Sequence, residues 1–248
     1  MKDLQSYLAF DGHESYKKNI VIYDKAMSNP SWEYDIDWQR DDRLMPPDLF
    51  NFGIRLASQS IYAEQLGMVT SAKLLAECES FSLRLGLATA VADESRHVNV
   101  FTKYIHKFHG TIPEPASHWN KVANEMNENK SFLYKFFVHT MLENQALEVF
   151  GLLIKIFKSY IIGDIYNCVR QDESRHVALG INFLSTKVKE TPSLKDEILL
   201  IYEESLPGVG VSLQACERYA SFMEEVNAQD IYEMMLKKQK NMLKLIIE

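Results

Sequence analysis

The word DESRHV occurs twice in the chain, at 93–98 and again at 172–177. Each copy places a His three residues after a Glu, as Glu94 with His97 and Glu173 with His176. Residues three apart lie on one face of an α-helix, so each copy can direct a carboxylate and an imidazole at the same point. Iron, manganese and zinc all accept imidazole nitrogen, and carboxylate oxygen suits the harder of these ions. The repeated word therefore predicts part of a two-metal site.

Two further glutamates precede the two copies at an identical spacing. Glu64 stands before Glu94 at the same separation as Glu143 stands before Glu173. In carboxylate-bridged helix bundles, one Glu from each of two further helices completes the ligand set. A single Glu-x-x-His usually marks a solvated helix face, so the prediction depends on the repeat. The predicted metal ligands are Glu64, Glu94, His97, Glu143, Glu173 and His176.

The alternative interpretation is a buried network of salt bridges without metal. Four buried carboxylates repel one another and lose hydration, so they need several cations nearby. Arg96 and Arg175, which lie inside the repeated words, offer only two positive charges. Asp93 and Asp172 precede the ligand glutamates and could accept a hydrogen bond from the far nitrogen of a ligand His across the bundle. A surface position for these two aspartates is equally open.

Two other residues compete for a place in the site. Glu148 lies five residues after Glu143, where it points to another side of the helix and breaks the repeated spacing. His139 lies one turn before Glu143, and it could be an additional ligand, a substrate contact or a packed core residue. We place Glu143 in the ligand set and leave His139 out of it.

Four long helices are expected to hold these side chains. Apolar residues recur every three or four positions in the ranges 48–76, 81–108, 131–159 and 164–190. The segment 110–117 contains two Pro and one Gly and separates the first pair of helices from the second. The sequence predicts an all-α protein of a single domain, 1–248, with the bundle at about 48–190, an irregular N-terminal arm at 1–47 and C-terminal helices at 191–248.

Composition limits the classes of partner and the cellular location that are expected. The net charge is −7, which argues against nucleic acid, and no apolar run reaches the roughly 18–20 residues of a membrane span. The three cysteines form no Cys-x-x-Cys pair, which favours free thiols in a reducing cytoplasm.

The sequence has no flavin or nicotinamide fingerprint, so redox chemistry needs an external electron donor such as a reductase or ferredoxin. The methionine-rich last helix is expected to cover the bundle, and a homodimer contact there stays open.

The doubled Glu followed by DExRH resembles the ferritin-like di-iron carboxylate superfamily over about residues 50–190. Its form is most similar to the hydroxylase large subunits of bacterial multicomponent monooxygenases. The resemblance implies a ferritin-like four-helix bundle, two Fe ions (with Mn/Fe as an alternative) on the six predicted ligands, and activation of O2. The resemblance also implies that Asp93 and Asp172 contact the ligand residues without binding the metal themselves. This chain is far shorter, carries Leu147 where those hydroxylases have Thr, and carries Phe101 where ribonucleotide reductase small subunits have the radical Tyr.

The expected function is oxidation of a small organic substrate by a di-iron, monooxygenase-like oxidase, with iron oxidation and storage as the alternative. Hydroxylation, N-oxygenation and desaturation are all compatible with the sequence. Residues near the ligands on the helix stripes are mostly small or apolar, which favours an apolar or aromatic substrate. The predicted pocket residues are Ala57, Ile61, Met68, Ala90, Val91, His139, Thr140, Ala146 and Leu147.

Overall fold

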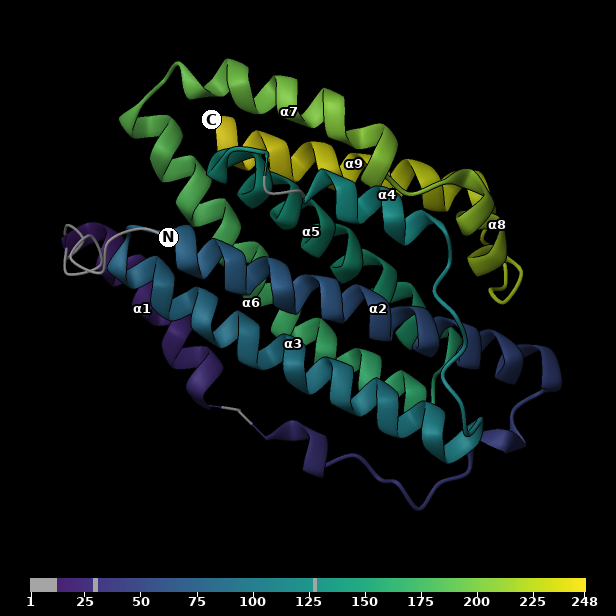
Figure 1. Ribbon diagram of the computed structural model, residues 1–248. Helices are drawn as coiled ribbons and strands as arrows, with labels where there is room; N and C mark the ends of the chain where they lie inside the picture. The colour runs from purple at the N-terminus through teal and green to yellow at the C-terminus, as the bar shows by residue number, and fades with distance from the viewer. Residues whose placement is uncertain (1–12, 29–30, 127–128) are drawn as a thin grey trace.

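A computed structural model describes residues 13–28, 31–126 and 129–248, and this part of the chain contains helices and no β-strand. Four long helices carry the repeated motif (Figure 1): α2 (Pro47–Glu77), α3 (Phe81–Phe108), α5 (Phe132–Ile156) and α6 (Ile161–Glu190). Five shorter helices surround them: α1 (His13–Ser28), α4 (His118–Glu125), α7 (Leu194–Val209), α8 (Leu213–Ala220) and α9 (Ala228–Ile247). The predicted all-α, ferritin-like bundle is confirmed.

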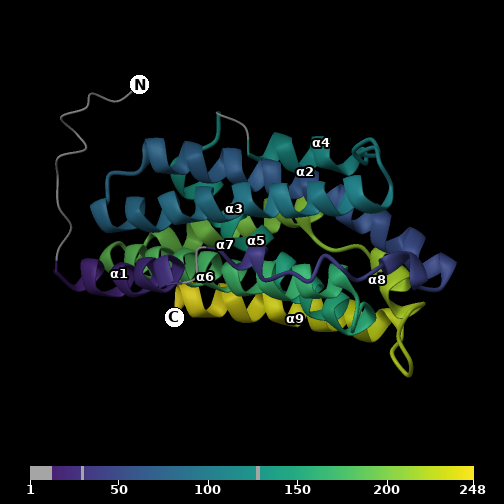
Figure 2. The ribbon, with the colours of Figure 1, turned by 90° about the horizontal axis from the view of Figure 1, so that it is seen from below.

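The four long helices associate as two antiparallel pairs. The connection from α2 to α3 and the one from α5 to α6 are both short, so consecutive helices run in opposite directions and pack along their length. Helix α3 also contacts α6, which joins the two pairs. In Figure 2, α2 and α3 lie on one side of the α5–α6 pair, and α9 lies on the other side. The bundle is therefore extended by a further layer on the side of α5 and α6.

Two hydrophobic clusters fill the two ends of the bundle. One gathers around Leu74, Leu83, Leu87 and Phe137, close to the connection between α2 and α3. The other gathers around Ile61, Phe101 and further residues toward the opposite ends of those helices. The predicted ligands of α2 and α3 fall between the two clusters along both helices. The hydrophobic effect thus holds the helices together on both sides of a polar centre.

Side-chain caps fix where the bundle helices begin. Ser80 accepts a hydrogen bond from the Leu83 backbone N–H at the start of α3, at 3.2 Å. The start of α6 is capped from far away in the sequence, because Asp42 accepts hydrogen bonds from the backbone N–H groups of Ile161 (2.9 Å) and Ile162 (3.1 Å). The N-terminal arm therefore contributes directly to the position of α6, the helix that carries the second copy of the motif.

Two details of the predicted element boundaries are wrong. The arm was expected to be irregular, but it contains α1 and the 3-10 turns η2 (Trp32–Tyr34) and η3 (Asp42–Leu44). Helix α1 packs on α3 and α6, so tertiary contacts stabilise a segment whose own apolar pattern is weak. The fourth long helix is predicted to begin at 164, but α6 begins at Ile161, and its first turn contains Gly163, where a Cβ atom would lie 2.3 Å from the Phe157 carbonyl oxygen.

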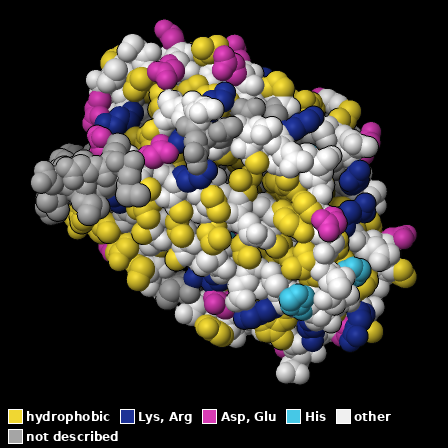
Figure 3. All heavy atoms as spheres, in the orientation of Figure 1, with side chains coloured by type: hydrophobic (Ala, Val, Ile, Leu, Met, Phe, Trp, Pro, Cys, Tyr) yellow, Lys and Arg dark blue, Asp and Glu magenta, His cyan; other side chains and the backbone are white. Residues whose placement is uncertain are grey.

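The surface carries both charged and apolar side chains. On the face shown in Figure 3, hydrophobic side chains gather across the middle and most charged side chains lie around them. Val69 of α2 is among the exposed large hydrophobic residues. Within the described ranges, no helix combines the length and the apolar character that a membrane crossing requires.

Candidate metal centre

The bundle brings all six predicted ligand residues into one buried cluster. Glu64 comes from α2, Glu94 and His97 from α3, Glu143 from α5, and Glu173 and His176 from α6, and every one of them is buried. Their potential ligand atoms form two groups in which all atoms lie within 4.8 Å of one another. The first group is Glu64, Glu94, His97 and Glu173, and the second is Glu94, Glu143, Glu173 and His176.

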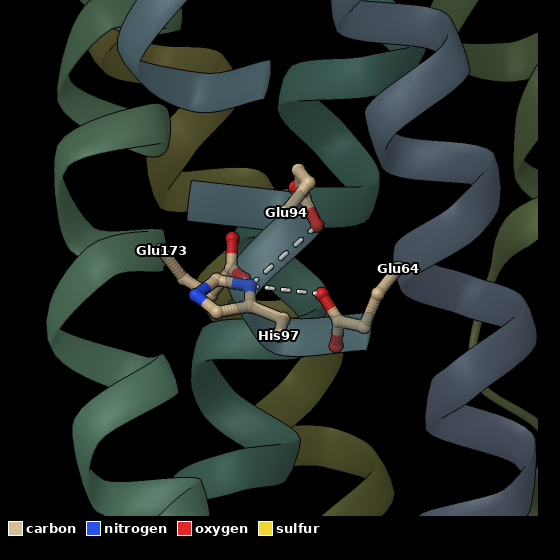
Figure 4. A group of neighbouring side chains, drawn as sticks. All are labelled: Glu64, Glu94, His97 and Glu173. Atoms are coloured by element: carbon tan, nitrogen blue, oxygen red, sulfur yellow. Dashed lines mark hydrogen bonds and ion pairs between the residues drawn. The ribbon is translucent and has the colours of Figure 1, made fainter. Parts of the chain in front are cut away.

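The first group is arranged around Nδ1 of His97 (Figure 4). This nitrogen lies 3.1 Å from Glu64 Oε2, 3.3 Å from Glu173 Oε1 and 3.6 Å from Glu94 Oε2. Three carboxylates from three different helices thus converge on one imidazole nitrogen. The other ring nitrogen, Nε2, faces away from them and lies 3.1 Å from Asp172 Oδ2.

The second group repeats this arrangement around Nδ1 of His176. This nitrogen lies 3.0 Å from Glu173 Oε2, 3.6 Å from Glu94 Oε1 and 3.7 Å from Glu143 Oε2. Its Nε2 lies 3.2 Å from Asp93 Oδ2. The rings of His97 and His176 are 6.4 Å apart between centroids. The site is therefore two half-sites side by side, with Glu94 and Glu173 belonging to both.

The charges of the cluster fit cations better than an empty core. Burial and the neighbouring Glu173, Glu143 and Glu64 raise the pKa of Glu94 well above its ordinary value. Burial opposes protonation of His97, but hydrogen bonds to Asp172, Glu173 and Glu64 raise its pKa well above the usual range. The raised pKa values of Glu94 and His97 favour bound protons at these two residues, and a metal ion would replace such protons.

The hydrogen bonding of the four glutamates leaves room for metal ligation. Among the described residues, no Lys or Arg lies within ion-pair distance of Glu64, Glu94, Glu143 or Glu173. Oε2 of Glu94 is buried and has no hydrogen-bond partner in this part of the chain. A buried carboxylate oxygen without a donor is costly, and a metal ion is one way to satisfy it. The residues present therefore fit two ions in an oxygen-rich site with one nitrogen ligand each.

The two arginines of the motif pair with aspartates instead of the ligand glutamates. Arg96 contacts Asp93 and lies 3.0 Å from Asp172 Oδ2. Arg175 lies 2.9 Å from Asp93 Oδ2 and 2.6 Å from Asp172 Oδ1. Both aspartates are buried, so the surface alternative for them is wrong. Each aspartate contacts the far nitrogen of the His on the opposite helix, which orients that imidazole.

Trp32 of the N-terminal arm is a part of the site that the sequence analysis missed. Its indole Nε1 donates a hydrogen bond to Asp172 Oδ2 at 2.8 Å, and Arg96 stacks over its ring at 5.5 Å from the centroid. The side chain is buried at 3% exposure. Trp32 lies far from Asp172 along the chain and belongs to no repeat, so spacing in the sequence could not reveal the contact.

The two competing residues of the third helix occupy different surroundings. His139 is buried, with Nδ1 at 3.2 Å from Glu143 Oε1 and Nε2 at 3.1 Å from the hydroxyl of Ser71. It contacts a predicted ligand but belongs to neither group of converging atoms. Glu148 pairs with Lys238 at 3.1 Å and also lies outside both groups. The geometry thus favours Glu143 over Glu148.

The predicted pocket residues lie on α2, α3 and α5, three of the four helices that carry the predicted ligands. Ala57 and Ile61 are part of the hydrophobic cluster at one end of the bundle, and Ala146 packs against it. Thr140 donates to the Phe136 carbonyl, and Leu147 accepts at its carbonyl from Arg170. Ala90 is buried, whereas Met68 and Val91 are half-buried. Their role in substrate binding stays a prediction.

Comparison with known proteins agrees with the architecture. No family model matches the sequence, and no curated protein matches it. Among solved structures, an R2-like ligand-binding oxidase with an aerobically reconstituted metal cofactor after photoconversion superposes with a TM-score of 0.75 at 18% identity, covering 94% of this chain and 93% of that chain. Two variants, one reconstituted with Mn/Fe and one with Fe/Fe, each give a TM-score of 0.77 at the same identity and coverage. The chain therefore has the ferritin-like helical fold of the R2-like ligand-binding oxidases.

Proposed function

We propose that the chain is an O2-dependent oxidase that holds two transition-metal ions, Fe/Fe or Mn/Fe, between α2, α3, α5 and α6. The observation that carries the proposal is the pair of four-membered groups that share Glu94 and Glu173. One ion would be held by Glu64 and His97, the other by Glu143 and His176, and the two shared carboxylates would contact both. The R2-like oxidases of the same fold carry Mn/Fe or Fe/Fe cofactors, which supports this assignment.

The residues around the ligands would support the same chemistry. Bound in this site, two reduced ions supply the electrons that O2 accepts. Asp172 and Asp93 would hold the two imidazoles so that Nδ1 stays directed at the centre. The hydrophobic clusters on both sides would exclude bulk water from the reaction.

For the substrate we propose a small apolar or aromatic organic molecule, because the predicted pocket residues near the ligands are mostly small or apolar. Hydroxylation, N-oxygenation and desaturation are the reaction types that this site chemistry accommodates. Because the sequence has no flavin or nicotinamide fingerprint, a separate reductase or ferredoxin would supply the electrons. The single-domain organisation over 1–248 and the cytoplasmic location inferred from three free cysteines belong to the same proposal.

An anaerobic titration of the metal-free protein with Fe(II), followed by rapid mixing with O2, tests the proposal. The expected result is saturation near two ions per chain and one rapid optical change whose decay is accelerated by small apolar compounds. Uptake far beyond two ions, with steady growth of ferric mineral, would instead favour the iron-storage alternative. Absence of tight Fe(II) or Mn(II) binding would refute both functions. The variant Glu148→Ala is the matched control, because it removes a nearby carboxylate of α5 that lies outside the cluster.

A further inference from the structure

Gly67 occupies an unusual place inside α2. It lies in the middle of a long helix that begins at Pro47, one turn after Glu64. Glycine is less favourable than alanine in a helix interior. Its backbone is not in the left-handed region, where glycine has an advantage over other residues. The reason for a glycine at this position must therefore lie in what surrounds it.

The Glu94 carboxylate fills the space where a side chain of residue 67 would lie. A Cβ atom on Gly67 would lie 2.9 Å from Cδ, 2.9 Å from Oε1 and 3.1 Å from Oε2 of Glu94. All three nearest atoms therefore belong to a single carboxylate. The other tightly approached helix glycines meet different groups. Gly86 approaches the methyl groups of Leu179, and Gly180 approaches the side chain of Thr140.

The repeat shows that this feature belongs to one half of the site. Gly67 stands three residues after Glu64, and its counterpart in the second half is Ala146, three residues after Glu143. The counterpart of Glu94 is Glu173. At this position the α5–α6 half has the methyl group of Ala146. The α2–α3 half has no side chain there, and the Glu94 carboxylate lies beside Gly67. Glu94 is also the ligand residue with a buried oxygen that lacks a hydrogen-bond donor among the described residues.

We propose that Gly67 is a positioning residue for Glu94. By omitting a side chain, it lets the carboxylate lie directly against α2, where its oxygens remain within the groups around both His97 and His176. The inference rests on the proposed function, because it takes Glu94 as a ligand shared by two ions. A methyl group at residue 67 would push the carboxylate away from α2 and disturb the arrangement that serves both ions.

The test compares Gly67→Ala with Gly151→Ala in metal-free full-length protein. Gly151 lies inside α5, and a Cβ there would meet Arg170 Nε at 3.4 Å, an ordinary contact, so this control has the same helix-propensity change without the carboxylate. Anaerobic Mn(II) titration followed by electron paramagnetic resonance counts bound ions and detects a magnetically coupled pair. We expect Gly67→Ala to weaken Mn(II) binding on the order of 10- to 100-fold and to lose the coupled-pair signal, because Glu94 belongs to both groups. Gly151→Ala should match the wild type.

A second substitution identifies the group that the methyl group disturbs. Glu94→Asp shortens the side chain by one methylene, so its carboxylate withdraws toward α3 and away from residue 67. Adding Gly67→Ala to Glu94→Asp should then change Mn(II) binding little, because the two sites are coupled. If Gly67→Ala alone does not fold without metal, the double variant should restore the circular dichroism spectrum and the thermal transition.

Each outcome separates the inference from the function on which it rests. Wild type that binds no pair of Mn(II) or Fe(II) ions would refute the proposed function itself. Wild type that binds a coupled pair, together with Gly67→Ala that binds it equally well, would refute only the role of Gly67. The role would also be refuted if Gly67→Ala weakened Mn(II) binding as much in the Glu94→Asp protein as in the wild type. If Gly67→Ala alone did not fold, a double variant that also failed to fold would refute the role as well.

Discussion

The half-site on α2 and α3 and the half-site on α5 and α6 have the same types of predicted ligand but different surroundings. Each contributes one Glu from its first helix and a Glu and a His from its second, and the His of each contacts an aspartate of the other. The N-terminal arm packs on α3 and α6, and its Trp32 lies against Asp172, the aspartate that contacts His97 of the first half. The second is backed by α9, which packs on α5 and α6.

The immediate neighbours of the ligands differ as well. Beside Glu64 and Glu94 the chain has Gly67, whereas beside Glu143 it has Ala146 and the buried His139. The two halves therefore repeat the predicted ligand residues, whereas the residues around those ligands differ. Two ions bound in such a site would have unequal environments.

The largest effect is expected from removing a carboxylate that belongs to both halves. Glu173→Ala should abolish tight binding of both ions, because each group loses a ligand and the bridge between them. Metal analysis after anaerobic loading and desalting measures ions per chain. The metal-free variant should still show a cooperative thermal transition, since one source of repulsion is gone. Retention of two ions in Glu173→Ala would contradict the shared role.

A smaller loss is expected when a carboxylate of one half is removed. Glu64→Ala should lose the ion of the α2–α3 half, and Glu143→Ala the ion of the α5–α6 half, so that each variant keeps about one ion. Titration with Mn(II), followed by electron paramagnetic resonance, should give an uncoupled ion in both variants, with different signal shapes because the halves differ. Identical spectra would indicate that the surroundings do not distinguish the two positions.

The aspartates behind the histidines should have an intermediate effect. Asp172→Asn and Asp93→Asn should each weaken metal binding on the order of 10- to 100-fold, because they orient the ligand imidazoles. Trp32→Phe removes the hydrogen bond to Asp172, the charged group of α6 that contacts His97, so it should lower the free energy of unfolding by about 1–3 kcal/mol. Chemical denaturation and Mn(II) titration measure the two quantities. If Trp32→Phe and Asp172→Asn lost metal affinity equally, the hydrogen bond from the N-terminal arm to Asp172 would determine the metal affinity at His97.

The smallest effect is a pH dependence of the metal-free protein. The pKa values of His97, His176 and Glu94 are raised above their ordinary values of 6.5, 6.5 and 4.5, despite the opposing effect of burial on the two histidines. Above these ordinary values the unfolded chain releases protons that the folded chain still holds. The free energy of unfolding of the metal-free protein should therefore fall as the pH rises from 6 to 8.

The matched measurement uses the same protein loaded with Mn(II). Bound metal requires deprotonated ligands, so affinity rises with pH and stabilises the folded chain more at pH 8 than at pH 6. Thermal unfolding at both pH values, with excess Mn(II) and with chelator, compares the two cases. A metal-free protein that becomes more stable between pH 6 and pH 8 would contradict the raised pKa values.

The sequence was sufficient to predict the parts of the protein that follow from local periodicity and spacing. The helix stripes predicted the four long helices to within a few residues, because apolar side chains at helical spacing must be buried together. The repeated spacing identified the six side chains that converge, because a Glu and a His three positions apart share a helix face. The ferritin-like fold followed from the same motif and is confirmed.

The tertiary structure decided what depends on contacts between distant segments. Trp32 and Asp42 come from an arm with little helical pattern, yet one contacts Asp172 and the other caps α6. The close approach of Gly67 to Glu94 depends on how α2 and α3 pack side by side. Spacing along one helix specifies which side chains share a face. Only the packing of helices against one another determines which side chain fills the space beside them.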